Sequence, residues 1–254
     1  MREEADSLIE SFRRYFKVGL AISPEQKQDV YGIRYRVYCE EFQYEDADQF
    51  PDNMEYDVFD EHALHGLITH IGTGRPAGCV RLVPGTKGVG VSNLPLETYC
   101  ADSLNKGFIE GLKAERSSMC EISRLAVDGA FRRRAGEAIT RFGEVDAIDC
   151  SLHERRTFSF ISVAAFLAAT AMSELSGCTN VFAMMEPFLP RLLKRSGIDF
   201  LKVGCDIDYH GIRAPYFSTL ESALRSMEPG MRELYEPIYD DMEAEYQLIT
   251  SGSE

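Results

Sequence analysis

Two charged residues, Glu121 and Arg124, stand inside CEISRLAV, a segment otherwise typical of a buried strand. In a regular strand their side chains would point to opposite faces. A β-bulge between them would turn both toward one cleft, where the carboxylate could act as a general base and the arginine could hold it or bind substrate. An edge strand with exposed charges is the alternative, but the flanking LAV and the apolar helix further along argue against it.

Arg81 stands in a similar run, GCVRLV, and raises the same question, because burying a charge without a partner costs several kcal/mol. Opposite charges are available in EYDVFDEHALH, where Asp57 and Asp60 lie three residues apart. They fit a solvated acidic loop, which is the commoner case, or a pair that holds a cation, a substrate ammonium or arginine side chains. We predict that these two carboxylates converge with the two strand arginines.

Two further groups have competing interpretations. Arg34 and Tyr38 in RYRVYCEEFQY are four residues apart on one helix face, which fits a site or core packing with a snorkelling arginine. FRRRAGE contains Arg132, Arg133 and Arg134, a local basic cluster that fits an anionic ligand such as phosphate, or a solvated basic loop.

Other chemistries are not predicted. His62 and His65 would face opposite sides of a strand, so the sequence predicts no metal site. The full glycine pattern of a P-loop or dinucleotide site is absent, and so is Gly-x-Ser-x-Gly. No cysteine is convincingly paired with a histidine as a nucleophile.

The elements that must position these residues follow from periodicity and from cap signals. The first expected helix covers residues 3–17. The second runs from SPEQ through DVYGIRYRVYCEEF, with Ser23 as N-cap and Pro24 in its first turn. The others are 103–113, 158–176 ended by Gly177, the short EPFLPRLLKRSG, and a tail over 221–247 broken at Pro229–Gly230. The expected strands are 63–71, 77–83, 119–127, TNVFAMM, FLKVG and APYFSTL. This order predicts an α+β fold, mostly antiparallel, in which 119–127 and TNVFAMM run parallel.

Composition narrows the class of protein. The 254 residues are 44% hydrophobic, enough for one domain over 1–254 with a helical C-terminal tail at about 221–254. A net charge of -14 argues against general nucleic-acid binding. Seven cysteines without a CxxC pair, no secretory signal and no membrane span predict a cytoplasmic protein with reduced thiols.

Taken together, these segments resemble the acyl-homoserine lactone synthase and N-acyl amino acid synthase superfamily of GNAT-type acyltransferases. The residues that carry the resemblance are, in order, Arg34, Tyr38, Tyr44, Asp57, Asp60, Arg81, Glu121 and Arg124. The later segment EPFLPRLLKRSGIDFLKVGCDIDYHGIRAPY looks like acyltransferases associated with exosortase and PEP-CTERM sorting systems, which are similar to long-chain N-acyl amino acid synthases. Tyr38 and Tyr44 depart from the Phe and Trp of the lactone synthases, which argues against a lactone-type acceptor.

The resemblance implies a GNAT fold whose central strand splays from its parallel neighbour, so that an acyl-phosphopantetheine arm enters a V-shaped gap. The implied activity moves a fatty acyl group, expected to be long, from an acyl carrier protein or coenzyme A thioester to the amine of an amino acid. Glu121 is the expected base that neutralises the amine, with Arg124 and Arg81 beside it. Backbone N–H groups near Ala126 and Val127 are expected to stabilise the oxyanion. The residues expected to shape the acceptor site are Arg34, Tyr38, Tyr44, Asp57 and Asp60.

The implied partner is an acidic acyl carrier protein, which needs a positive patch on this acidic chain. The expected docking residues are Arg132, Arg133, Arg134, Arg191, Lys194 and Arg195, which follow two parallel strands and so belong at one end of the sheet. We expect no metal and no tightly bound cofactor, and peripheral membrane contact could accompany a lipid product.

Three alternatives stay open. A lactone synthase would use S-adenosylmethionine as acceptor. A small-acyl acetyltransferase would use acetyl-CoA and would have a narrow acyl tunnel. A non-catalytic binding protein could retain the fold and its charges.

Overall fold

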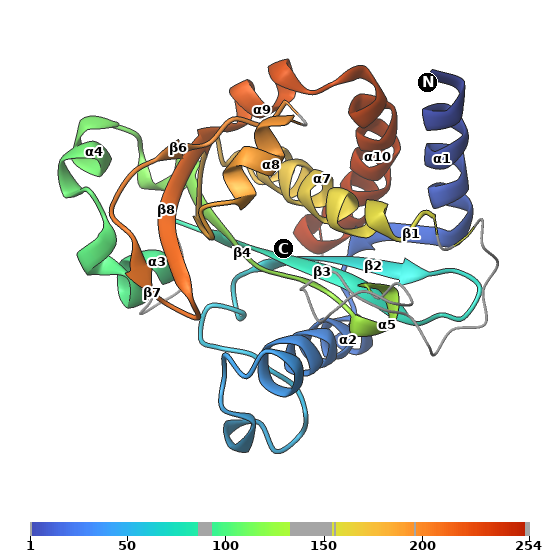
Figure 1. Cartoon of the computed structure of the whole chain (residues 1–254), viewed down its shortest axis with the longest axis horizontal. Coiled ribbons are helices and arrows are strands. Elements are labelled where there is room, and N and C mark those ends of the chain that lie inside the picture. The colour runs from blue at the N-terminus through green and yellow to red at the C-terminus, as the bar shows by residue number, and fades with distance from the viewer. Residues whose placement is uncertain (1, 86–92, 133–153, 155, 196, 252–254) are drawn as a thin grey trace.

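A central sheet organises the chain in the computed structural model, which describes residues 2–85, 93–132, 154, 156–195 and 197–251 (Figure 1). The strands follow the order β1-β2-β3-β4-β5-β8-β6, and β7 pairs with β8. All neighbouring pairs are antiparallel except β4 and β5, which are parallel. The predicted α+β class with a mostly antiparallel sheet is confirmed.

The described elements have the following bounds. The strands are β1 (Phe16–Leu20), β2 (Leu64–His70), β3 (Pro76–Pro84), β4 (Met119–Val127), β5 (Asn180–Met185), β6 (Leu201–Lys202), β7 (Ile207–Asp208) and β8 (Ile212–Thr219). The helices are α1 (Arg2–Tyr15), α2 (Pro24–Arg34), α3 (Pro95–Tyr99), α4 (Lys106–Gly111), α5 (Gly129–Arg132), α7 (Ser159–Leu175), α8 (Leu189–Arg195), α9 (Leu220–Ser226) and α10 (Pro229–Ser251). A π-helix, η1 (Tyr35–Glu41), continues α2, and short 3₁₀ turns are η2 (Ala47–Gln49), η3 (Ala101–Ser103) and η4 (Arg116–Ser118).

The two parallel strands separate after three residue pairs. Met119, Cys120 and Glu121 pair with residues 180–182 of β5. Beyond them β4 stays paired with β3 as far as Val127, while β5 stays paired with β8 as far as Met185. The predicted splaying of the central strands is therefore confirmed, and it opens the sheet beside the charged part of β4.

Helix α7 covers one face of the sheet and α2 covers the other (Figure 1). Alanines of α7 are fully buried there, and Gly66 and Gly78 in β2 and β3 let the helix come close. A Cβ on Gly78 would meet the Ile161 Cγ2 atom at 2.9 Å, so a larger residue there would force the helix away from the sheet. Helix α2 begins where the sequence predicts, since Ser23 and Gln26 form a capping box and Pro24 occupies its first turn.

Some predicted boundaries are wrong. The first helix ends at Tyr15 rather than 17, because Phe16 begins β1, a strand the sequence did not predict. The helix expected at 103–113 is shorter, since α4 covers only Lys106–Gly111. Helix α3 was not predicted. The tail is broken at residues 227–228 instead of at Pro229–Gly230, since a proline that lacks an N–H fits the first turn of α10.

No helix in the described part of the chain is long and apolar enough to cross a membrane.

Candidate active site

A β-bulge at Arg124 and Leu125 brings the Arg124 side chain to the same face of β4 as Glu121. Arg81 pairs with Ser123 and Cys79 with Ala126, so Arg124 and Leu125 together lie opposite Val80 alone. Arg124 has φ of 50°, a left-handed conformation that costs a residue with a side chain about 1–2 kcal/mol. Such strain concentrates at functional sites. The sequence suggests a bulge between Glu121 and Arg124, and the structure has it at Arg124 and Leu125.

Glu121 lies at the point where β4 and β5 part, and its side chain is only 3% exposed. One carboxylate oxygen accepts a hydrogen bond from the Leu96 backbone N–H at 2.7 Å. Burial raises the pKa of Glu121 to about 8, although this hydrogen bond and the charges of Arg81 and Arg124 act against the rise. A carboxyl group with a pKa near the working pH can both take up and release a proton, as a general base must.

Glu121 should leave a signature in stability, because folding raises its pKa from the ordinary 4.5 to about 8. The folded chain then binds a proton that the unfolded chain has lost. Relative to Glu121→Gln, the wild type should lose free energy of unfolding as pH rises from about 4.5 to about 8, and the difference should be constant above that. Urea unfolding of both proteins, followed by far-ultraviolet circular dichroism across this range, measures the difference. If the difference in free energy of unfolding between the two proteins does not change over this pH range, the pKa of Glu121 is not raised by folding.

Beside Glu121 lies a network of three arginines and four carboxylates: Arg34, Arg81, Arg124, Glu45, Glu55, Asp57 and Asp60. Arg34, at the end of α2, is the most deeply buried member of the network and is fully buried. The guanidinium donates to Glu55 at 2.5 Å and to both Asp60 oxygens at 2.7 and 3.0 Å. The interpretation of Arg34 as a snorkelling core residue is therefore wrong.

The second arginine, Arg81, joins the carboxylates to β4. It donates to Asp57 at 2.7 Å, to Asp60 at 3.0 Å and to the Ser123 hydroxyl at 3.1 Å. Asp57 and Asp60 are held in place by their own turn, since Asp60 accepts from the Asp57 N–H and Asp57 accepts from the Phe59 N–H. These contacts fix both carboxylates against the sheet rather than in solvent.

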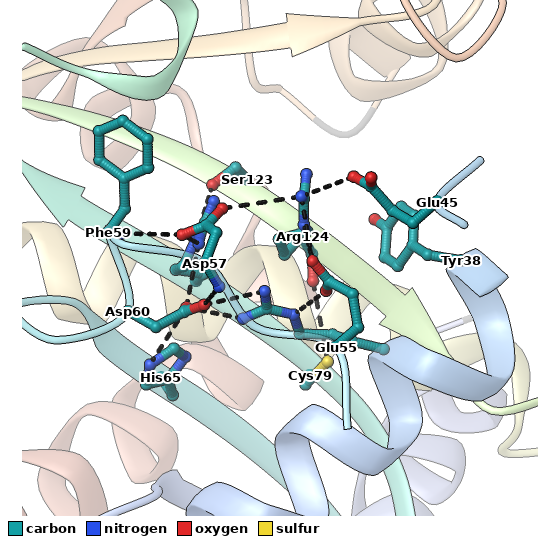
Figure 2. Close-up of polar contacts among 12 residues, drawn as sticks. Tyr38, Glu45, Glu55, Asp57, Phe59, Asp60, His65, Cys79, Ser123 and Arg124 are labelled. Atoms are coloured by element: carbon teal, nitrogen blue, oxygen red, sulfur yellow. Dashed lines mark hydrogen bonds and ion pairs between the residues drawn. The ribbon is translucent and has the colours of Figure 1, made fainter. Parts of the chain in front are cut away.

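The third arginine, Arg124, lies at the top of the network between three carboxylates (Figure 2). It donates to Glu45 at 2.9 Å and to Glu55 at 3.2 Å, and its Nη2 lies 3.7 Å from Asp57 Oδ2. Its guanidinium also lies over the Tyr38 ring, 5.4 Å from the centroid. The predicted convergence of Asp57, Asp60, Arg81 and Arg124 is confirmed.

Charge pairing offsets the cost of burial in this network. Burial alone would raise the pKa of Glu55 and of Asp60, but Arg34 and the neighbouring arginines lower the pKa of Glu55 below its ordinary value and that of Asp60 well below. His65 packs beneath Asp60 at 3.7 Å, and burial lowers its pKa to about 3, so its ring is neutral near pH 7. Ion pairs with Arg34, Arg81 and Arg124 thus hold Glu55 and Asp60 in place, and the network supports the bulged strand from below.

A cavity of about 270 Å³ occupies the gap between β4 and β5 and is lined from both faces of the sheet. On the α2 and α3 side its lining includes Tyr38, Tyr44, Arg81, Glu121, Arg124 and Arg213. On the α7, α8 and α9 side its lining includes Phe166, Ala169, Thr170, Leu189, Ile198 and Ala223. The cavity thus has a polar end with the titratable groups and an apolar end among helices.

Three residues expected in the acceptor site do not line this cavity. Arg34 is fully buried, and Asp60 is 4% exposed between Arg34 and Arg81. Asp57 likewise contacts Arg81 and Arg124 instead of the cavity. We therefore place these three beneath the site as its support, and Tyr38 and Tyr44 in its wall. The Tyr38 hydroxyl donates to the Leu125 carbonyl at 3.0 Å, which holds the ring against the bulge.

The backbone N–H groups expected to stabilise an oxyanion differ from one another. The Asp128 N–H donates to the Ala77 carbonyl of β3 at 2.9 Å, and the Ala126 N–H is directed at the Cys79 thiol, also in β3. Because in-plane N–H directions alternate along a strand, the Val127 N–H points away from β3 and toward the gap. Val127 is thus the better placed of the two, and Ala126 is engaged elsewhere.

The first expected docking cluster is only partly described, because Arg133 and Arg134 lie outside the described residues. Arg132 is 7% exposed, forms an ion pair with Glu41, and lies 5.1 Å over the Phe42 ring. Its expected place in an exposed patch is therefore corrected. It lines the cavity instead.

The second cluster lies on α8, which follows the carboxyl end of β5, as α5 follows that of parallel β4. Arg191 is exposed, and Lys194 is 69% exposed with an ion pair to Asp199 at 3.2 Å. Arg195 belongs to the same helix. Arg191 and Lys194 are therefore open to a partner.

In the described residues, no group of three or more His, Cys, Asp or Glu side chains is placed to hold a metal ion.

Sequence reasoning missed several residues of the site. Glu45 and Glu55 belong to the charged network, and Tyr99, Tyr209 and Arg213 line the cavity, but no motif marks any of them. The missed signal for the glutamates is a charge count, since three buried arginines need more than two carboxylates.

Comparison with known proteins agrees with this geometry. Residues 33–141, from the end of α2 past the bulge, match the family model described as an acetyltransferase (GNAT) domain. The chain has a GNAT-type acyltransferase fold. No curated protein sequence matches it.

Solved structures share this GNAT-type fold at low identity. TofI, in a ternary complex with an inhibitor and MTA, is 16% identical with a TM-score of 0.57, covering 85% of this chain and 99% of TofI. BjaI, a CoA-dependent acyl-homoserine lactone synthase with SAM and isopentyl-CoA, is 16% identical with a TM-score of 0.55, covering 88% and 89%. FeeM, an N-acyl amino acid synthase from uncultured soil microbes, is 13% identical with a TM-score of 0.53, covering 84% and 94%. These structures do not bear on the exosortase-associated part of the resemblance, which stays a prediction.

Proposed function

We propose that this GNAT-type domain is an N-acyltransferase that moves a fatty acyl group from an acyl carrier protein thioester to the amine of an amino acid. The observation that carries the proposal is the single cavity through the gap between β4 and β5, polar on one face of the sheet and apolar on the other. An acyl thioester bound in that gap would place its acyl chain among α7, α8 and α9 and its carbonyl carbon beside Glu121. FeeM, described as an N-acyl amino acid synthase, shares the fold.

The reaction needs one new bond and two proton transfers. The amine nitrogen attacks the thioester carbon, the C–N bond forms, the C–S bond breaks, and the thiolate takes a proton to leave as a thiol. Glu121, directly or through a water, takes the proton that the attacking amine loses. The Val127 N–H donates to the oxyanion that forms in between. Arg81 and Arg124 hold the bulged strand in place beside the reacting atoms.

The apolar end of the cavity supports a fatty rather than an acetyl donor. Phe166, Ala169, Leu189, Ile198 and Ala223 surround it, and an acetyl group would leave this apolar surface without a ligand. Small residues of α7 keep the space open, since larger side chains at Ala169 would fill it. The donor would therefore bind by burying its chain between α7, α8 and α9.

Carrier-protein docking should depend on the exposed cations of α8. Reversing Arg191 and Lys194 to Glu should raise KM for acyl carrier protein far more than KM for the amine, because steering acts on association with the acidic partner. It should also flatten the salt dependence of kcat/KM, since exposed charges are screened. Lys106→Glu on α4 is the matched control. Unchanged carrier-protein kinetics at low salt would show that α8 is not the docking surface.

Incubation of the purified protein with an acyl carrier protein or coenzyme A thioester, amino acids and S-adenosylmethionine tests the proposal. We expect N-acyl amino acids by mass spectrometry and no methylthioadenosine. Release of methylthioadenosine with a lactone product would establish the lactone synthase alternative. Acetyl transfer without longer chains would establish a small-acyl enzyme, and no transfer at all would favour a non-catalytic protein. A lipid product would also allow peripheral membrane contact, which vesicle sedimentation can measure.

A further inference from the structure

One arginine of the cavity wall belongs to none of the networks described above. Arg213 lies on β8, where Pro215 and Phe217 alternate with it on the same face. Phe217 packs in the cluster that contains Leu96, the residue whose N–H bonds to Glu121. Arg213 therefore faces the same side of the sheet as the carboxyl group of Glu121, and both line the cavity.

The guanidinium of Arg213 has unused hydrogen-bonding capacity. Its Nε is buried and has no acceptor among the described residues. Its ion pair with Glu186 is long, at 3.9 Å, and its Cζ lies 5.4 Å over the Tyr44 ring. Burial raises the pKa of Glu186 despite the nearby charge, whereas arginines lower the pKa of Glu55. The Arg213–Glu186 contact is thus weaker than those of the network.

The other arginines of the cavity wall are already engaged. Arg81 bonds to two aspartates and a serine, and Arg124 contacts three carboxylates. Arg132 is paired with Glu41 beneath its aromatic contact. For any of these to bind a new anion, it would have to release a buried carboxylate, which costs several kcal/mol. Arg213 can accept an anion without breaking a short ion pair.

We infer that Arg213 binds a carboxylate on the acceptor, so that the acceptor is an amine bearing a carboxylate rather than a simple amine. The inference rests on the proposed function and names the residue of the same site that recognises the acceptor's carboxylate. A guanidinium presents two parallel N–H groups that match a carboxylate, and the Tyr44 ring covers one face of the Arg213 guanidinium. An acceptor held this way presents its amine toward Glu121 on the same face of the sheet.

The test compares three matched acceptors with one acyl thioester. They are an amino acid that the wild type uses, its primary amide, and its decarboxylated amine. Arg213→Met should lower kcat/KM for the amino acid about 10- to 100-fold, chiefly through KM, since a hydrogen-bonded charge pair is lost. The same variant should change kcat/KM for the two neutral acceptors less than about threefold, which is small beside the loss of such a bond. Arg213→Lys should fall between. Arg225→Met is the control, because that guanidinium is 74% exposed on α9.

The outcomes separate the two proposals. If Arg213→Met lowers kcat/KM for all three acceptors by the same factor, or leaves the amino acid unaffected, Arg213 does not bind the carboxylate, although the proposed function stands. If the wild type acylates neutral amines as well as amino acids, the inference is also overturned. If the wild type acylates no amine, both proposals fail. Thermal unfolding by circular dichroism checks that each variant is folded.

Discussion

Glu121→Gln is expected to lower kcat for amide formation by about 10²–10⁴, the usual contribution of a positioned general base. Glutamine keeps the size of the side chain and an oxygen that can accept from the Leu96 N–H. It cannot take a proton from the amine. KM for the acyl thioester should change little, because the carboxylate acts on the amine and not on the donor. Steady-state rates at pH 8 with saturating substrates measure the effect.

Glu97→Gln is the matched control for this variant. Glu97 is likewise a glutamate near this end of β4, but it lies in α3. It accepts hydrogen bonds from Leu94 and Arg116 and does not line the cavity. Its replacement should leave kcat within a few-fold of wild type. If the kcat of Glu121→Gln is also within a few-fold of wild type, Glu121 is not the base.

Arg34→Met is expected to lower the free energy of unfolding by about 3–5 kcal/mol, because it removes one of the two arginine partners from each of two buried carboxylates. Glu55 and Asp60 are 1% and 4% exposed, and Arg34 gives both of them hydrogen bonds of 3.0 Å or less. A whole domain is stable by only about 5–15 kcal/mol, so this one change removes a large share. Urea unfolding followed by circular dichroism measures it.

Two comparisons make the result specific. Arg225→Met breaks an exposed pair with Glu221 and should cost at most about 1 kcal/mol. Adding Glu55→Gln and Asp60→Asn to Arg34→Met should restore part of the loss, because the unpaired charges are then gone. A loss below about 1 kcal/mol for Arg34→Met itself would mean that the network does not hold the fold together.

Charge in an apolar strand was the most informative signal in the sequence. The bulge at Arg124 and the meeting of Arg81 with Asp57 and Asp60 follow from the cost of unpaired buried charge, and both are found. The parallel pairing of β4 and β5 follows from the helix between them. These expectations succeeded because each rests on a physical requirement that holds in any fold.

What the sequence did not predict lies mostly in loops and at strand ends. Glu45 and Glu55 come from a long acidic loop without periodicity, so nothing local separates a buried glutamate from a solvated one. Arg132 reads as one of three exposed arginines, but the end of η1 brings Glu41 against it. Arg213 resembles any charged residue at the start of a strand until β8 is placed beside β5. These positions depend on contacts between distant segments, which no short pattern encodes.

We propose that the protein transfers fatty acyl groups to amino acids in the gap between β4 and β5. Mass spectrometry of lipids from cells that express the wild type or Glu121→Gln tests this proposal most directly. The wild type should accumulate species with the mass of a fatty acid plus an amino acid minus water, and the variant should lack them at equal protein levels. Equal amounts of such lipids in both cultures, or none in either, would contradict the account.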